Sequence, residues 1–152
     1  KLIESSVRET RGLAEKKNLK VLTEIEPSLQ KITCDKDKIM QVLINLLSNA
    51  IKFTPEGKAI RVFCKAYADD ASYVHVMVAD EGVGVPEDEL ETIFNKFVQS
   101  SKTKTGAGGT GLGLAICKEI VNGHGGKIWA ENNPSGGSWF SVLLPVNPKR
   151  GM

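Results

Sequence analysis

The stretch that decides the fold is residues 74–86, which read VHVMVADEGVGVP. Valines alternate with other residues through Val78, the pattern of a strand with one buried face. Asp80 continues the same period of two, so we expect its carboxylate to point toward the layer that the valines bury. A buried carboxylate needs a fixed partner. That partner is either the amino group of a ligand or a neighbouring backbone N–H or buried water.

Two glycines, Gly82 and Gly84, follow this carboxylate. Because glycine has no Cβ, both positions allow the backbone to approach a flat ligand closely. They are also compatible with a tight turn that closes the strand. The residues alone leave both interpretations open.

A second strand and a long helix precede this stretch. Residues 60–66 alternate in the same way, and we expect them to pair with residues 74–78. Asp35 has the position and chemistry of an N-cap for a helix that reaches about Phe53. Its apolar face, at helical spacing, consists of Ile39, Val42, Leu43, Leu46, Leu47 and Ala50.

The same helix carries a polar stripe of Asn45, Asn49 and Lys52. At about 100° per residue these positions fall within about 60° of one another around the helix. Carboxamide oxygens suit a hard cation and a lysine suits phosphate, so the stripe has the chemistry to hold a magnesium-bridged phosphate. An ordinary solvated helix face has the same pattern, and the stripe alone does not separate the two.

Residues 106–113 contain five glycines directly before a predicted helix over residues 112–122. A helix N-terminus offers free N–H groups to a phosphate, and Lys102 and Lys104 add charge to a closing flap. The alternative is a flexible linker. The glycines also match the G-x-G-x-x-G fingerprint, but the polar residues 99–105 lack the strand that a dinucleotide-binding fold needs.

The remaining segments complete the predicted architecture. Residues 1–18 read as a helix, 19–25 and 32–34 as extended, 88–94 as a short helix, and 127–130 and 138–144 as a final strand pair. The order of helix, strands, helix, hairpin, helix and hairpin predicts an α+β fold. We expect a two-layer α/β sandwich with one mixed sheet and helices on one face.

The overall composition narrows the class of protein. With 152 residues the chain forms one domain, and a net charge of +2 gives no electrostatic basis for binding nucleic acid or a membrane. No apolar run is long enough to span a bilayer. The three cysteines, Cys34, Cys64 and Cys117, are far apart and read as free thiols in a reducing compartment.

Four segments, taken in order, closely resemble the catalytic domain of sensor histidine kinases, in the wider group with DNA gyrase, Hsp90 and MutL. They are residues 45–55 (the N box), 80–86 (the G1 box), 94–97 (the F box) and 109–114 (the G2 box). The likeness covers essentially the whole chain. It implies the Bergerat-type ATP-binding fold, with a mostly antiparallel sheet against about three helices.

The resemblance also implies a ligand, ATP with Mg²⁺, and residues that contact it. Asn49, with Asn45 assisting, would bind the metal, and Lys52 would contact phosphate. Asp80 would accept a hydrogen bond from the adenine amino group, with the two glycines that follow it close to the base. Residues 98–109 would form the ATP lid, and further contacts would come from Phe97, Lys104, Gly109, Thr110, Gly111, Leu112 and Gly113.

One position favours a kinase over a hydrolase. In the ATPase relatives, the residue four before the metal-binding Asn is a Glu that activates water; here it is Asn45, which has no useful basicity. Phosphoryl transfer depends mostly on positioning and charge neutralisation. Loss of the base therefore does not prevent transfer to another nucleophile.

Neither His75 nor His124 resembles a phospho-acceptor, because the first lies inside a strand and the second in a glycine turn. The resemblance implies that the acceptor lies on an upstream dimerisation hairpin, that a response regulator acts downstream, and that the kinase is cytoplasmic or anchored to a membrane elsewhere. We expect the isolated chain to be a monomer that cannot phosphorylate itself. Two alternatives stay open: a pseudokinase-like nucleotide-binding module and a serine kinase of the anti-sigma type.

Overall fold

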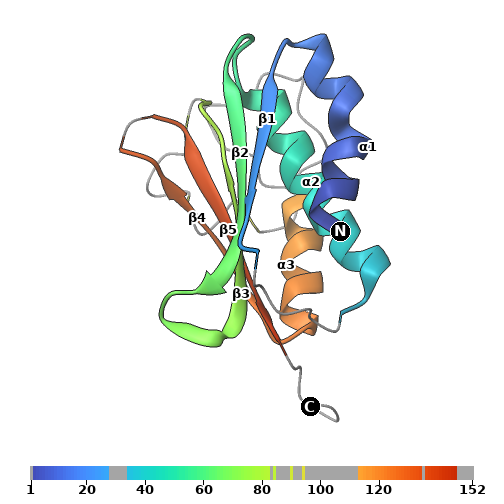
Figure 1. The fold of residues 1–152 in the computed structure, drawn as a ribbon, viewed down its shortest axis with the longest axis vertical. Helices are drawn as coiled ribbons and strands as arrows, with labels where there is room; N and C mark the ends of the chain where they lie inside the picture. Colours follow the sequence, from blue (N-terminus) through green and yellow to red (C-terminus); the bar gives the residue numbers. More distant parts are fainter. Residues whose placement is uncertain are drawn as a thin grey trace.

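A computed structural model describes residues 2–27, 34–82, 84, 90, 94, 113–134 and 136–146. Within these ranges, three helices cover one face of a five-stranded sheet (Figure 1). The elements are α1 (Leu2–Lys16), β1 (Lys20–Ile25), α2 (Lys36–Phe53), β2 (Ala59–Tyr67), β3 (Asp70–Ala79), α3 (Gly113–Gly123), β4 (Lys127–Asn132) and β5 (Ser138–Pro145). The predicted two-layer α+β sandwich is confirmed.

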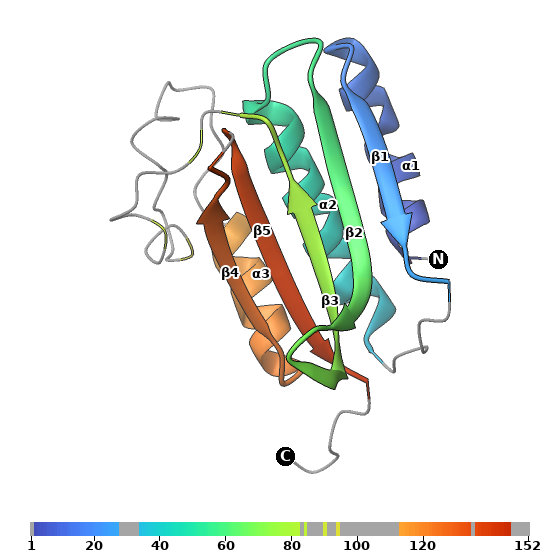
Figure 2. The same cartoon turned by 60° about the vertical axis from the view of Figure 1, so that its left-hand side comes forward.

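The sheet places β3 at its centre. The strand order is β1-β2-β3-β5-β4, and only β1 and β2 run parallel among these neighbours (Figure 2). Val78 lies opposite Val62 of β2 and Phe140 of β5. The chain that leaves β3 therefore emerges at one end of the sheet, in the middle, between the ends of the neighbouring strands β2 and β5.

The helix α2 is the central helix of the second layer, because it packs against both α1 and α3. Asp35 is its N-cap: the carboxylate accepts a hydrogen bond from the Lys38 N–H at 3.2 Å. All six residues of the predicted apolar face are buried, and Ile51 joins them. The predicted cap and face are confirmed.

A histidine ties α3 to the start of α2. His124, in the turn after α3, accepts a hydrogen bond at Nε2 from the Asp35 N–H at 3.0 Å. Its other ring nitrogen lies 2.8 Å from the Ile120 carbonyl oxygen. The acceptor role of Nε2 puts the ring proton of the neutral imidazole on Nδ1. The turn was predicted, but this contact over 89 residues of sequence was not.

The first helix, predicted at residues 1–18, buries polar as well as apolar residues. Ile3 and Ala14 are buried, and so are the hydroxyl residues Ser6 and Thr10. Ser6 Oγ donates to the Ile3 carbonyl at 2.7 Å, and Thr10 Oγ1 donates to the Ser6 carbonyl at 3.0 Å. Because the helix's own carbonyls accept these bonds, the hydroxyls can be buried at little cost.

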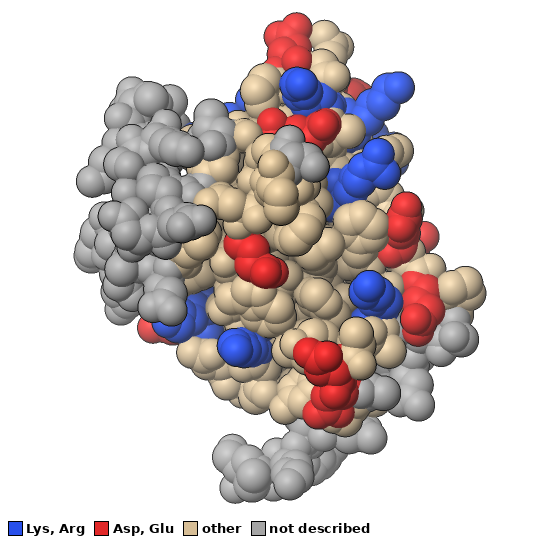
Figure 3. All heavy atoms as spheres, turned by 90° about the vertical axis from the view of Figure 1, so that its left-hand side faces the viewer, with Lys and Arg blue, Asp and Glu red and all other residues tan. Residues whose placement is uncertain are grey.

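The other sheet face carries no helix in the described part of the chain, and Figure 3 looks onto it. Uncharged side chains cover much of it, with charges of both signs between them. His75 lies in β3, inside a strand as predicted, and on this face, with its ring centroid 5.6 Å from that of Trp129 and 5.5 Å from that of Tyr67. Burial, and then the positive charge of Lys65, lowers the pKa of His75.

Some predicted segments lie partly or wholly outside the described residues. Of the predicted short helix at 88–94, the structure describes Leu90 and Phe94. Of the extended segment at 32–34 it describes Cys34, which is in no strand. Residues 99–109 are not described. In the described helices, none is long and apolar enough to cross a membrane, and the three cysteines are free.

A lysine from the end of α1 closes the last turn of α2. Lys17 Nζ donates to the carbonyl oxygens of Ile51 at 2.8 Å and of Lys52 at 3.0 Å. A helix C-terminus carries unpaired carbonyls and a partial negative charge, so a cation there is stabilising. This contact fixes the end of the helix that carries the polar stripe.

We predict that Lys17→Met lowers the free energy of unfolding by about 1 kcal/mol, since it removes two charge-assisted hydrogen bonds from carbonyls at a helix end. Lys16→Met is the matched control, because Lys16 is an exposed lysine at the end of the same helix. Urea denaturation of both variants measures the difference. Equal unfolding free energies for the two variants would show that the Lys17 contact contributes nothing.

Candidate functional site

The centre of the candidate site is the carboxylate of Asp80. Its Oδ1 accepts hydrogen bonds from the backbone N–H of Gly82 at 2.9 Å and of Ser138 at 3.2 Å. Its Oδ2 accepts a third, from Ser138 Oγ at 3.1 Å. The Asp80 N–H in turn donates to the Ser138 carbonyl oxygen at 3.0 Å. The side chain is therefore held by the turn after β3 and by the first residue of β5.

This carboxylate is buried, as the alternation of the valines predicted: Asp80 is 7% exposed. Burial raises its pKa above the usual 3.8, because the charged form loses contact with water. The hydrogen bonds from Gly82 and Ser138 oppose the rise. The structure thus buries an acidic group where its charge is costly, and hydrogen bonds from Gly82 and Ser138 stabilise the charged form.

The glycines after Asp80 are required by the protein's own packing. A Cβ on Gly82 would lie 2.6 Å from the Phe53 carbonyl oxygen. Gly84 has φ +77°, in the left-handed region, and a Cβ there would lie 3.2 Å from Asn132 Oδ1. Gly82 thus allows a close approach of the protein's own backbone, and Gly84 allows a left-handed turn. Neither requirement needs a bound ligand.

The close approach at Gly82 joins two parts of the predicted site. Phe53 is the last residue of α2, so the end of the helix with the polar stripe meets the segment that follows Asp80. Asn45 and Asn49 are half-buried and Lys52 is exposed. Lys52 Nζ lies 5.5 Å from the centroid of the Phe53 ring. The structure thus brings the end of the stripe and the buried carboxylate to one side of the sheet.

The helix predicted after the glycine-rich segment is α3. It begins at Gly113, where a Cβ would meet nothing within 4 Å, and it packs against α2. Its N-terminus therefore lies directly after the glycines of residues 106–111 in the chain. The other predicted contacts fall outside the described residues: Phe97, Lys104, Gly109, Thr110, Gly111 and Leu112.

Sequence reasoning missed three residues that build this site: Ser138, Gly137 and Phe53. Gly137 has φ +83°, and its Cα packs so closely on the Asp80 carbonyl that a Cβ would clash with it. Ala79 of β3 lies opposite Trp139 of β5, which brings Ser138 beside Asp80. The sequence did show two glycines directly before the last strand. Their close contact with Asp80 could not be predicted, because it depends on how β5 pairs with β3.

The residues suit a metal that needs few protein ligands. Among the described residues, no cluster of three or more His, Cys, Asp or Glu side chains is placed to hold a metal ion. The stripe offers two neutral carboxamides instead. Mg²⁺ keeps several waters and takes most of its other ligands from phosphate, so one or two protein oxygens fit it.

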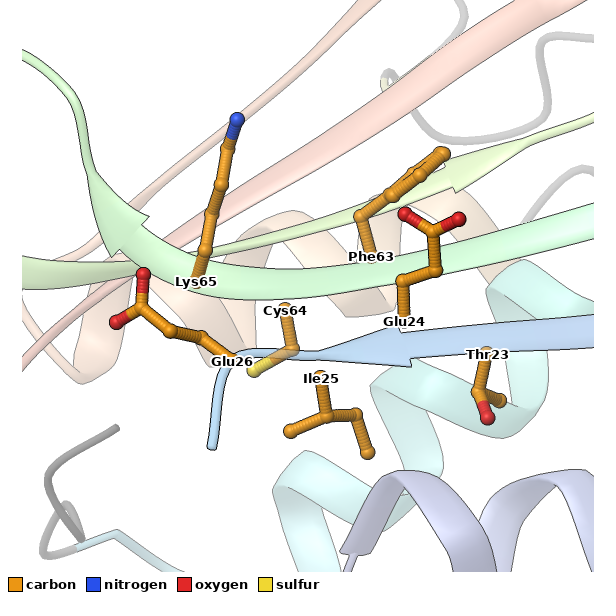
Figure 4. Close-up of a pocket in the computed structure, with 7 residues that line it drawn as sticks. All are labelled: Thr23, Glu24, Ile25, Glu26, Phe63, Cys64 and Lys65. Carbon is orange, nitrogen blue, oxygen red and sulfur yellow. The ribbon is translucent and has the colours of Figure 1, made fainter. Parts of the chain in front are cut away.

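The structure also has a hollow of about 600 Å³ that belongs to a different region. It lies at the edge strand β1 and its neighbour β2, and none of the predicted site residues line it (Figure 4). Ile25 and Thr23 point toward the helices, whereas Glu24, Phe63 and Lys65 point to the opposite side. Cys64 lines the hollow, and burial raises its pKa to about 11.

Comparison with known families gives a match over most of the chain. The family model described as "Histidine kinase-, DNA gyrase B-, and HSP90-like ATPase" matches residues 34–148. Adaptive-response sensory kinase SasA of Prochlorococcus marinus (strain MIT 9313) is 38% identical over 135 residues. Sensor histidine kinase WalK of Bacillus subtilis (strain 168) is 42% identical over 120 residues. These matches cover 89% and 78% of this chain but only 36% and 20% of the relatives.

Solved structures give the same result for the fold. The catalytic domain of histidine kinase ThkA, in a nucleotide-free form, has a TM-score of 0.83 and 34% identity, covering 97% of this chain and 93% of that one. A structure of ThkA in complex with response regulator protein TrrA has a TM-score of 0.81 and 31% identity, covering 98% of this chain and 40% of that one.

We predict that Asp80→Asn changes the pH dependence of stability. Since the folded-state pKa of Asp80 is raised above 3.8, its favourable contribution is fully present below that value and is lost as the pH rises through the folded-state pKa. The variant lacks this loss. The unfolding free energy of the variant should therefore increase relative to that of the wild type as the pH rises from 3.5. Urea denaturation from pH 3.5 to 7.5 measures the difference.

Asp70→Asn is the matched control, with the opposite sign. Hydrogen bonds from Ser72 lower the pKa of Asp70, so its contribution is present above 3.8 and is lost as the pH falls. Parallel profiles for the wild type and Asp80→Asn would mean that Asp80 is not held as the structure describes.

Proposed function

This chain belongs to the family of histidine kinase-, DNA gyrase B- and HSP90-like ATPases, as a catalytic domain of the sensor histidine kinase type, and we propose that it binds ATP with Mg²⁺ and transfers the γ-phosphoryl group to a histidine on a separate domain. The chain spans about a third of the length of the first curated relatives it matches. The activity and partners of the whole protein are therefore part of the proposal.

The observation that carries the proposal is the hydrogen-bonding capacity left on Asp80. An ionised carboxylate has about four acceptor positions. Donors from the described residues occupy three of them, two at Oδ1 and one at Oδ2. The position on Oδ2 that these residues leave suits the 6-amino group of adenine, which is a donor. A buried acceptor fixed by three donors recognises such a group without reorganising.

We assign the phosphate end of the site to α2 and the start of α3. Lys52 lies in the last turn of α2, with an exposed side chain that reaches phosphate oxygens. Asn49 is the main metal ligand and Asn45 assists it. Bound Mg²⁺ would neutralise charge on the phosphates. The glycines at 109, 111 and 113, with Thr110 and Leu112, bring backbone N–H groups to the phosphates at the start of α3.

We assign the lid to residues 98–109, hinged on glycine, with Phe97 and Lys104 among the residues that contact ATP. This assignment rests on the resemblance of the F and G2 boxes. Closure of such a segment would exclude water from the γ-phosphoryl group. With Asn45 in place of a basic residue, this position supplies no group that activates water, which supports transfer over hydrolysis.

The proposed partners follow from the relatives. We propose that the acceptor histidine lies on a separate dimerisation domain. ThkA has been solved with a response regulator protein, which supports a response regulator as the final acceptor here. We propose a cytoplasmic domain that is monomeric in isolation and binds no nucleic acid.

We predict that Asp80→Asn weakens ATP binding by about 10- to 100-fold, the range for a lost hydrogen bond to a charged group. The Asn Nδ2 donor would face the adenine amino group but could pair with the 6-oxo group of inosine triphosphate. The ratio of ATP affinity to inosine triphosphate affinity should therefore fall. Titration calorimetry with both nucleotides measures it.

Asp70→Asn makes the same chemical change at the other end of β3 and should leave both affinities unchanged. An unaltered ATP affinity in Asp80→Asn would remove the adenine assignment. Transfer of label from γ-labelled ATP to an added histidine-bearing dimerisation domain separates a kinase from a nucleotide-binding module, which would bind ATP without transfer. Stable label on this chain alone would contradict the absence of an acceptor.

A further inference from the structure

The imidazole of His124 links the backbones of α3 and α2 at one end of the helix pair. Its Nε2 accepts from the Asp35 N–H at 3.0 Å, and its Nδ1 donates to the Ile120 carbonyl oxygen at 2.8 Å. Asp35 is the N-cap of α2, and Ile120 lies in the last turn of α3. The ring therefore makes one directional contact to each helix. The nucleotide site as proposed gives this histidine no role.

The turn that carries this histidine is fixed on the sheet. The His124 N–H donates to the Val121 carbonyl oxygen at 3.1 Å, and the Gly126 N–H donates to the same oxygen at 3.0 Å. Gly126 packs so closely on β5 that a Cβ there would clash with the Leu143 carbonyl oxygen. The histidine thus ties the start of α2 to α3 and, through this turn, to the sheet.

Two contacts define how α3 lies along α2. Besides the contact of the histidine, Cys117 Sγ donates to the Val42 carbonyl oxygen at 3.8 Å. Val42 lies seven residues after Asp35, and Cys117 lies seven residues before His124. Seven helical residues span about 10 Å. Because the steps are equal and run in opposite directions along the chain, the two helices lie side by side and antiparallel.

This register sets the level of the phosphate end of the proposed site. One more turn brings Gly113, the first residue of α3, level with Leu46 of α2. Asn49 and Lys52 come after Leu46, so they lie beyond the start of α3, and Figures 1 and 2 show α2 extending past α3 there. The N–H groups without helical partners point out of a helix start along its axis. At α3 they are therefore directed toward the level of the polar stripe.

We propose that His124 is a positioning residue, which sets the register of α3 along α2 and thereby the spacing between the two parts of the phosphate site. The inference rests on the proposed function, in which Asn49 and Lys52 and the start of α3 hold one triphosphate with its metal. Apolar contacts between helices are not directional, whereas a hydrogen bond weakens steeply away from its best geometry. Small displacements of groups that act together reduce their effect strongly.

The test separates the two hydrogen bonds of the ring. His124→Gln places a side-chain oxygen near the position of Nε2, where it can accept from the Asp35 N–H. His124→Asn can still donate to the Ile120 carbonyl, but its shorter side chain does not reach Asp35. Each variant keeps one of the two bonds. A role in stability alone predicts similar effects, whereas the positioning role predicts that Gln restores the wild-type behaviour and Asn does not.

Affinities for ATP with Mg²⁺ and for adenosine distinguish the two ends of the site. Adenosine lacks phosphates, so its affinity should be the same in the wild type and both variants. His124→Asn should lower the affinity for ATP with Mg²⁺ by roughly 10-fold, within the usual range for coupling between distant sites. His124→Gln should keep most of it. Titration calorimetry measures both affinities, and equal ratios in the Asn and Gln variants, whether normal or lowered, would overturn the proposal.

A second readout uses the protein without nucleotide. Nuclear Overhauser contacts between Val42 and Cys117 report the register of the helices. They should weaken in His124→Asn and remain in His124→Gln. Cys64→Ala, which removes a buried side chain from β2, is the control for a general loss of stability, and urea denaturation measures that loss in each variant. Unchanged contacts in a folded His124→Asn variant would overturn the proposal.

Failure of the proposed function looks different. If the wild type binds adenosine as tightly as ATP with Mg²⁺, the phosphate end of the site is wrong, and the positioning role falls with it whatever the variants show. If the wild type prefers ATP and His124→Asn alone loses that preference, both the phosphate site and the positioning role are supported.

Discussion

The structure depends on one costly arrangement, a carboxylate buried at the end of the central strand. Asp80 remains there because Gly82 and Ser138 supply three donors, two of them backbone N–H groups. Those donors come from the turn after β3 and the start of β5, so the strand register, the glycine turn and the last strand must all form together. A group that is so expensive to bury and so fully constrained is suited to recognise one ligand donor.

The second constraint is the placement of α2. Other elements hold both of its ends: His124 accepts from Asp35 at the start, and Lys17 donates to Ile51 and Lys52 at the end. Along its length, α3 contacts it through Cys117. The polar stripe therefore lies on a helix whose axial position and rotation are fixed, which is what a metal and phosphate site requires.

Much of this was predictable because it is local. The alternation of valines predicted the burial of Asp80, and an acidic cap with helical spacing predicted α2. Contacts between distant residues were not predictable: Ser138 meets Asp80 across 58 residues and His124 meets Asp35 across 89. Such pairs depend on the strand order and the register, which no local pattern encodes. The residues alone left a ligand approach and a turn open for the glycines at 82 and 84, and the contacts that a Cβ would make with the Phe53 carbonyl and Asn132 depend on the tertiary structure.

In the proposed complex, the carboxylate of Asp80 faces the amino group of adenine. The most direct test follows the Asp80 carboxyl carbon by ¹³C NMR in a pH titration, with and without saturating ATP. A donor bound to Oδ2 favours the charged form, so ATP should lower the pKa of Asp80 from the raised value that burial gives it. The same pKa in the free and ATP-saturated protein would contradict the account.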